Sequence, residues 1–190
     1  SKMCKLDADK TAVVLGCGME GLLTVAALKT LGINKIIVID KESEKSRAME
    51  FGAWEFIGSH GKNGVAGVKD KIRAAAGDMA DAVFICTDSP MGRNVARRFM
   101  KNSGSICEMG FLCGWRRTPT ARYFEDSMPA GGRFYAARDY ENCMNFLAKA
   151  AEMKLPLYKL ITHRYKLEEI NEAMWTVVRE EGLGIAVFNR

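Results

Sequence analysis

The sequence predicts an α/β fold with a doubly wound parallel sheet. Three observations favour this class. Short apolar runs of strand length alternate with segments of helical period, several of the helical segments end at a glycine, and a glycine-rich turn joins the first strand to its helix. Such alternation is typical of parallel strands joined by crossover helices. At 190 residues, the chain can bury one sizeable core, or form one domain and part of another.

The expected elements follow one another in a regular order. Strands are predicted over residues 11–15, 35–40, 55–58, 81–87 and 104–110. Helices are predicted over 20–32, 43–52, 68–77 and 92–102. After an irregular stretch at 111–131, the pattern resumes with a strand near 133–137, a helix over 139–153, a strand, a helix over 167–180 and a strand over 185–188.

Composition argues against several classes of protein. The chain has no apolar run of about 18 residues or more, and it begins with the polar segment "SKMCKLDADK", so we expect a cytoplasmic protein without a membrane segment. The net charge of +5 is spread along the chain, and the basic clusters lack interleaved aromatic residues, so nucleic-acid binding is not expected. Six cysteines without CxxC spacing favour reduced structural thiols over disulfides or a zinc site.

A GxGxxG pattern lies within "VVLGCGMEGLL", residues 13–23, directly after an apolar strand and at the start of a helix. Gly16 permits a tight turn, Gly18 lets backbone N–H groups approach a diphosphate, and Gly21 allows close packing of helix and strand. The N-terminus of the helix then faces the anion. The pattern predicts a dinucleotide-binding turn of the Rossmann type.

Asp40 ends the second predicted strand, 24 residues after Gly16. An acid near this spacing accepts hydrogen bonds from the adenosine ribose hydroxyls and repels a 2′-phosphate, so NAD is favoured over NADP. A nucleoside-binding methyltransferase also ends this strand in an acid, but its loop usually reads GxGxG, and Gly21 favours the dinucleotide. The alternative is a glycine-rich turn with an incidental aspartate.

The order of these motifs resembles the zinc-type medium-chain dehydrogenases, which include alcohol, sorbitol and threonine dehydrogenases. The resemblance covers most of the chain. It rests on the glycine turn and on the segments "IIVIDKESEKSRAMEFGA", "DAVFICTDSP", "GSICEMG" and "LITHRYKLEEINEAMWTVV".

The resemblance implies a set of cofactor-binding residues. The glycine triplet Gly16, Gly18 and Gly21 would bind the NAD diphosphate, and the turn residues between them, Cys17, Met19 and Glu20, would also belong to the cofactor site. Asp40 would bind the ribose with help from Lys45, and Thr87 would lie beside the cofactor cleft. The resemblance also implies a homodimer, formed when the strand near 133–137 pairs with its symmetry mate.

The same resemblance implies two parts of the chain. Residues 1–154 would form the dinucleotide-binding domain, and 155–190 would complete the edge of its sheet or return to a substrate domain. In the family that domain lies upstream and holds the catalytic zinc. The 15 residues before Gly16 contain Cys4 but no histidine or second thiol, so zinc is expected only in a missing N-terminal domain. No metal ligand or catalytic residue is assigned to this chain, and His60 and His163 are interpreted as structural.

We therefore expect the NAD-binding domain of an oxidoreductase that transfers a hydride between a nicotinamide cofactor and an alcohol or polyol-like substrate. The parent would be an NAD-dependent zinc-type dehydrogenase, and this chain an inactive fragment of it. The other possibilities are a natural protein that has lost its chemistry, and a non-catalytic Rossmann module that senses a nucleotide or binds a partner.

Glu20 departs from the family pattern, in which the matching residue is typically apolar and packs behind the nicotinamide ring. A basic residue often found near the C-terminus is also replaced, by Gly184, and Arg93, Arg116 and Arg117 are candidates to supply the lost charge. Three interpretations of Glu20 stay open. It points to solvent and favours the helix dipole, it meets a polar or cationic substrate group, or the site no longer performs hydride transfer.

Overall fold

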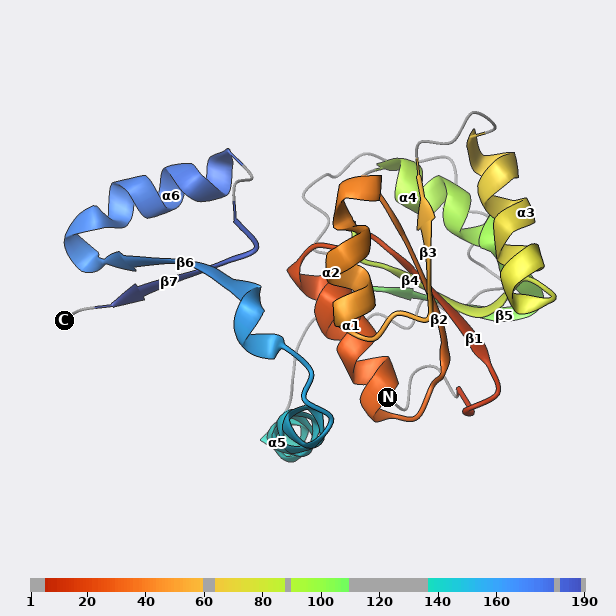
Figure 1. Ribbon diagram of the computed structural model, residues 1–190, viewed down its shortest axis with the longest axis horizontal. Helices are drawn as coiled ribbons and strands as arrows, with labels where there is room; N and C mark the ends of the chain where they lie inside the picture. Colours follow the sequence, from red (N-terminus) through yellow and green to blue (C-terminus); the bar gives the residue numbers. More distant parts are fainter. Residues whose placement is uncertain (1–5, 60–63, 88–89, 110–136, 180–181, 189–190) are drawn as a thin grey trace. The chain divides into compact units, whose positions relative to one another are not determined.

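The computed structural model in Figure 1 describes residues 6–59, 64–87, 90–109, 137–179 and 182–188. Its contacts divide the chain into two compact units, Ser1–Leu155 and Pro156–Arg190. Each unit is described by itself. The expected loop at 111–131, residues 133–136 of the expected strand and His60 lie outside the described residues, whereas Ala137 begins a helix.

The first unit contains a five-stranded parallel sheet in the order β3-β2-β1-β4-β5. Its strands are β1 (Thr11–Leu15), β2 (Lys35–Asp40), β3 (Glu55–Gly58), β4 (Ala80–Ile85) and β5 (Met100–Glu108). The chain runs outward from β1 to β3 and then returns to β4 on the other side of β1. The sheet therefore has a point of reversal between β1 and β4, as in the doubly wound fold that the sequence predicts.

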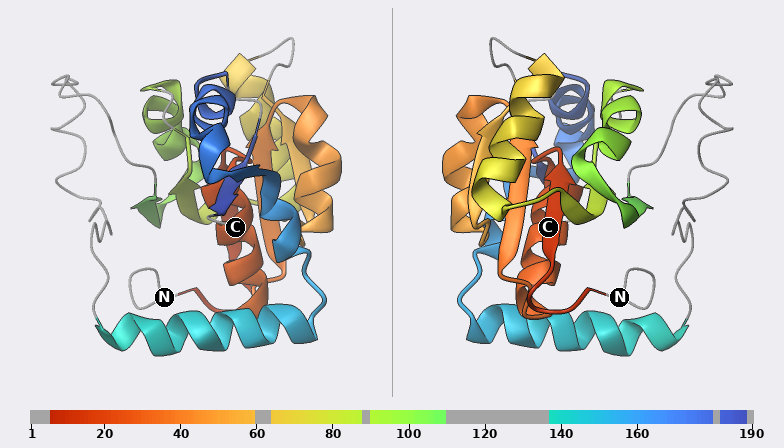
Figure 2. Two further views of the ribbon diagram at one scale, coloured as in Figure 1. Left: turned by 90° about the vertical axis from the view of Figure 1, so that its left-hand side faces the viewer. Right: turned by 90° about the vertical axis from the view of Figure 1, so that its right-hand side faces the viewer.

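Helices cover both faces of this sheet, as right-handed crossovers require. In Figure 1, α1 (Met19–Thr30) and α2 (Lys45–Glu50) lie on one side, and α3 (Gly64–Ala76) and α4 (Pro90–Ala96) lie on the other. The long helix α5 (Ala137–Glu152) contacts α1 (Figure 2). Short 3-10 turns, η1 (Glu42–Glu44) and η2 (Arg97–Phe99), precede α2 and follow α4.

The core explains why the strands read as continuous apolar runs. All five residues of β1 are buried, because alternate side chains enter the layers on opposite faces of the sheet. On the α3 and α4 side, Val13, Leu15, Ile37 and Ile39 belong to one buried cluster with Val68, Ile72, Ala96 and Phe99.

The helix predicted over 92–102 was placed wrongly at its C-terminal end. The helical turns stop at Phe99, and β5 begins at Met100, four residues before the predicted start of the strand. Phe99 and Met100 are buried in the core, and Met100 pairs with Ala80 before an irregularity shifts the register. Burial of these two side chains outweighs the local helical pattern.

The second unit is a parallel β-α-β arrangement, with the elements in the predicted order. Strands β6 (Ile161–Lys166) and β7 (Gly184–Phe188) pair with each other, and α6 (Ile170–Val178) connects them together with the short turn η5 (Leu167–Glu169). A further turn, η4 (Leu157–Leu160), precedes β6. The Tyr165 hydroxyl lies 2.7 Å from Thr176 Oγ1 and joins α6 to β6.

The division of the chain into a cofactor domain at 1–154 and a returning segment at 155–190 stays a prediction. Within the described residues, no helix is both long and apolar enough to cross a membrane.

Candidate functional site

The turn between β1 and α1 can be built only with glycine at two positions. Gly16 has φ +99°, and a Cβ there would lie 2.5 Å from the Cys86 carbonyl oxygen. A Cβ at Gly21 would overlap the Gly16 carbonyl oxygen. Gly18 differs from both, because no atom of the described residues, apart from Gly18 and its chain neighbours, lies within 4 Å of its Cβ position, so this part of the turn is open to a ligand.

The start of α1 presents backbone donors beside this open position. Its first helical hydrogen bond runs from the Leu22 N–H to the Gly18 carbonyl oxygen, at 3.0 Å. In any α-helix the N–H groups of the first turn precede the first such bond and point out of the helix end. Such a helix start, preceded by a close-packed glycine turn, is suited to bind a diphosphate.

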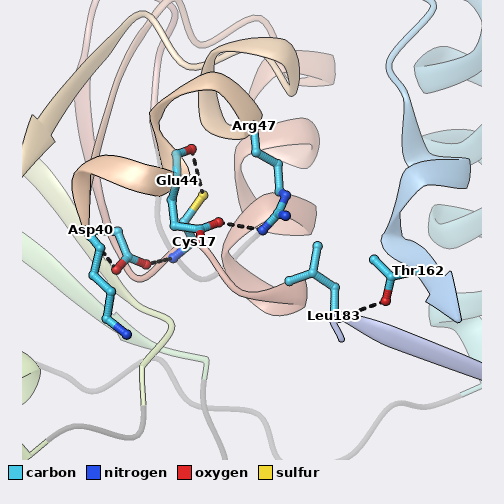
Figure 3. A network of polar contacts seen from close by, with 7 residues as sticks. Cys17, Asp40, Glu44, Arg47, Thr162 and Leu183 are labelled. Atoms are coloured by element: carbon cyan, nitrogen blue, oxygen red, sulfur yellow. Dashed lines mark hydrogen bonds and ion pairs between the residues drawn. The ribbon is translucent and has the colours of Figure 1, made fainter. Parts of the chain in front are cut away.

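Asp40 is bonded to the same turn from the end of β2. Its Oδ2 accepts the Cys17 N–H at 2.5 Å (Figure 3). Its Oδ1 accepts the Lys41 N–H at 2.6 Å. A carboxylate oxygen can accept more than one hydrogen bond, so both oxygens keep capacity for ligand hydroxyls. The backbone bonds thereby hold an anionic acceptor at the edge of the turn.

A second set of contacts fixes the segment that follows Asp40. Glu44 Oε2 lies 2.5 Å from the Arg47 guanidinium, and the Glu44 carbonyl oxygen lies 4.0 Å from the Cys17 thiol (Figure 3). Lys45 is exposed at the start of α2, with its Nζ 3.8 Å from Glu42 Oε1. Lys45 is therefore paired with an acid of its own segment.

A pocket of about 440 Å³ opens at the carboxyl ends of these strands. Gly16, Asp40 and Thr87 line it, together with Lys41 and Ser59. Its apolar wall comes from α3, α4 and the turn after α4, through Val65, Val68, Val95 and Phe99. Its volume and its few polar groups at one edge are typical of small-molecule sites.

The structure brings together part of the predicted set of site residues. Gly16, Asp40 and Thr87 meet in the pocket, Cys17 and Gly21 are buried behind the turn, and Gly18, Met19 and Glu20 are exposed at the start of α1. Lys45 does not line the pocket. Gly184 begins β7 in the second unit, whereas Arg116, Arg117 and the side chain of Arg93 lie outside what the structure describes.

Several pocket residues were missed by the sequence interpretation. Ser59 directly follows β3, so the general rule that ligands bind at carboxyl ends of strands could have identified it. Val65, Val95 and Phe99 belong to no motif, and only the packing of α3 and α4 brings them to the pocket.

The two thiols beside the turn are held in their neutral form. Burial, with the nearby charges of Asp40 and Glu44, raises the pKa of Cys17 to about 12, although Arg47 opposes this rise. Burial also raises the pKa of Cys86 to about 12. Both side chains therefore serve as protonated packing groups at neutral pH rather than as nucleophiles.

The remaining thiols and histidines add no ligand set. Cys143 is a free, exposed thiol, and Cys107 is buried in β5. His163 Nδ1 lies 3.0 Å from Thr162 Oγ1, and its ring stacks on Tyr165. Across the part of the chain that is described, no three His, Cys, Asp or Glu side chains are grouped to hold a metal ion.

The family match and the individual relatives of this chain point to the same protein family. Residues 21–149 match the family described as zinc-binding dehydrogenase. Sorbitol dehydrogenase 1 of Saccharomyces cerevisiae is 29% identical over 178 residues, which cover 91% of this chain and 49% of the relative. The D-xylulose reductase of Scheffersomyces stipitis is 26% identical over 181 residues, with 91% and 49% covered. The chain thus spans about half the length of these relatives.

Solved structures agree in fold. The 2R,3R-butanediol dehydrogenase of Bacillus subtilis superposes with a TM-score of 0.74 at 25% identity, covering 100% of this chain and 53% of that one. An alcohol dehydrogenase of Thermotoga maritima gives a TM-score of 0.78 at 20% identity, with 97% and 52% covered. The chain belongs to the zinc-binding dehydrogenase family, and it carries the NAD(P)-binding domain of that family.

Proposed function

We propose that this chain is the NAD-binding domain of a cytoplasmic dehydrogenase that transfers a hydride between nicotinamide and an alcohol or polyol. The observation that carries the proposal is Asp40, held by the Cys17 and Lys41 N–H groups at the edge of the pocket. The substrate class is supported by relatives whose names specify sorbitol, D-xylulose and butanediol.

The residues of the turn fit the cofactor that the family implies. The N–H groups at the start of α1 would bind the diphosphate, and Asp40 would accept the adenosine ribose hydroxyls. The nicotinamide, when bound, supplies the hydride-transfer chemistry. The described residues offer no ligand set for zinc. The proposal assigns zinc to an upstream substrate domain, as the family resemblance implies.

NAD should bind more tightly than NADP, because a 2′-phosphate would stand beside the Asp40 carboxylate. Calorimetric titration of the full chain should show a preference of about tenfold or more, and Asp40→Ala should narrow it. Asp70→Ala, an equal change of charge at an exposed site on α3, is the control and should leave the preference intact. Equal affinity of the unmutated chain for both nucleotides would remove the assignment of Asp40 to the ribose.

The second candidate is a non-catalytic module that senses a nucleotide or binds a partner. Glu20 favours it, because the matching residue of the resembled family is typically apolar and packs behind the nicotinamide ring, so a carboxylate there departs from the pattern of the hydride-transfer enzymes. The sequence of the native gene separates the two functions. An upstream segment of about a hundred residues or more with Cys and His ligands supports the enzyme.

The proposed function includes a homodimer. The strand expected near 133–137 would pair with its symmetry mate and run one sheet through the dimer, because an unpaired strand edge favours association. Sedimentation at micromolar concentration should show a dimer. A strict monomer would contradict the expected pairing.

A further inference from the structure

Glu20 occupies the face of α1 that is turned toward β4. One helical turn further along that face, Thr24 Oγ1 lies 3.5 Å from the Cys86 thiol and donates to the Glu20 carbonyl oxygen at 2.8 Å. Residues four apart share one face of a helix, and side chains lean toward the helix N-terminus. The Glu20 side chain therefore lies on the β4 side of the glycine turn, at the carboxyl edge of the sheet.

Two further observations support this placement. The Cβ position of Gly21 is 3.5 Å from Cys86 Cβ, so the first turn of α1 is packed directly on the residue that follows β4. Burial is the main cause of the raised pKa of Cys86. A hydrogen bond with Thr24 lowers this pKa, and the nearby charge of Glu20 raises it. The carboxylate is thus close enough to the end of β4 to act on groups there.

The strand order separates the two halves of a dinucleotide bound at this edge. Asp40 ends β2 on one side of β1, and Thr87 follows β4 on the other side. A cofactor whose adenosine ribose meets Asp40 and whose diphosphate meets the start of α1 must place its nicotinamide half toward β4. Glu20 and the nicotinamide then share one side of the turn.

We propose that Glu20 makes this site bind the oxidised cofactor, NAD⁺, in preference to NADH. The proposal rests on the function proposed above. The nicotinamide ring is positively charged in NAD⁺ and neutral in NADH, whereas the diphosphate is the same in both. Repulsion between Glu20 and the diphosphate therefore cancels in the ratio of the two affinities, and attraction to the charged ring remains.

The test compares the full chain with its Glu20→Gln variant, using three ligands. NAD⁺ and ADP-ribose are titrated by calorimetry, and NADH by its fluorescence. ADP-ribose carries the diphosphate but no nicotinamide. In Glu20→Gln, the ratio of the NADH to the NAD⁺ dissociation constant should fall by about three- to tenfold. Glu141→Gln on α5, an exposed site with the same change of charge, should leave the ratio unchanged.

The ligands separate the failure of this inference from the failure of the proposed function. Equal tightening of all three ligands in Glu20→Gln would show that Glu20 acts on the diphosphate alone, and it would overturn the inference. Unchanged affinities would overturn it too, because the carboxylate would then act on neither group. If the unmutated chain bound none of the three ligands, the proposed function would fail and the inference with it.

Discussion

The two ends of β1 are each bonded to an aspartate of a neighbouring strand, but the two aspartates are held differently. At the start of β1, the Thr11 N–H donates to Asp81 Oδ2 at 2.9 Å, and Lys101 Nζ lies 2.9 Å from Asp81 Oδ1. Beyond the end of β1, Asp40 accepts backbone N–H groups at both oxygens. A lysine offsets the charge of Asp81, whereas backbone dipoles hold Asp40 beside a pocket. One carboxylate is therefore neutralised within the fold, whereas the other borders the pocket.

The surroundings of the two aspartates support this division. Near Asp81, the irregular start of β5 fills the space, because a Cβ at Gly104 would meet Met100 and the Asp81 carbonyl oxygen. Near Asp40, the Cβ position of Gly18 is open. One end of the sheet is closed by packing, and the other is kept open by glycine.

The largest expected effect concerns the glycines of the open end. Gly21→Ala and Gly16→Ala should each lower the free energy of unfolding by about 3 kcal/mol or more, because their new Cβ atoms would meet backbone. Gly18→Ala should cost less than about 1 kcal/mol, since its Cβ would enter open space. Urea unfolding followed by circular dichroism measures all three. Similar costs for Gly18 and Gly21 would contradict the described turn.

Gly18→Ala also tests what the open space is for. Its Cβ would stand where a diphosphate must approach the backbone, so NAD affinity should fall by about tenfold while stability is kept. Calorimetric titration of this variant provides the measurement. Unchanged affinity would show that the ligand does not approach Gly18.

The next effect separates the two aspartates. Asp81→Asn should lower the free energy of unfolding by about 1–2 kcal/mol, because it weakens the charged hydrogen bond to Lys101. It should leave the affinities for NAD and NADP as they are. Asp40→Asn should instead alter the ratio of these affinities. Urea unfolding measures the stability of both variants, and calorimetry measures their affinities for NAD and NADP. A changed ratio of these affinities in Asp81→Asn would contradict the different roles of the two aspartates.

The sheet could be predicted from sequence more fully than the site. Buried parallel strands read as apolar runs, so β1 and β2 were found at their observed bounds, and Gly32 marked the end of α1. Local pattern failed at Met100, where long-range pairing with Ala80 decides the conformation.

Within the site, the glycines and Asp40 could be predicted, because they belong to a motif with a fixed spacing in the sequence. The apolar wall of the pocket could not be predicted, because Val65 and Phe99 reach it only through the packing of separate elements. The role of Lys45 in ribose binding stays a prediction. Its ion pair with Glu42 could not be predicted, because it depends on the 3-10 turn η1 that places Glu42 beside the start of α2.

The smallest expected effect is the pH dependence of the closed end. Burial alone would raise the pKa of Asp81, but the Thr11 N–H and Lys101 outweigh it, so the pKa is lowered. A carboxylate with a lowered folded pKa contributes stability above its unfolded pKa of about 3.9, and that contribution is lost as pH falls through the folded pKa.

The stability gap between the unmutated chain and Asp81→Asn should therefore stay constant from pH 7 to about pH 5 and shrink below about pH 4. Protonated Asp81 then resembles the asparagine, since neither carries a charge for Lys101 to offset. Urea unfolding at several pH values measures this difference in stability directly. In a Lys101→Met background the difference should depend less on pH, because the substitution removes the cation beside the Asp81 carboxylate. A gap that persists undiminished to pH 3 would mean that shape rather than charge makes Asp81 stabilising, and the contrast with Asp40 would then rest on ligand binding alone.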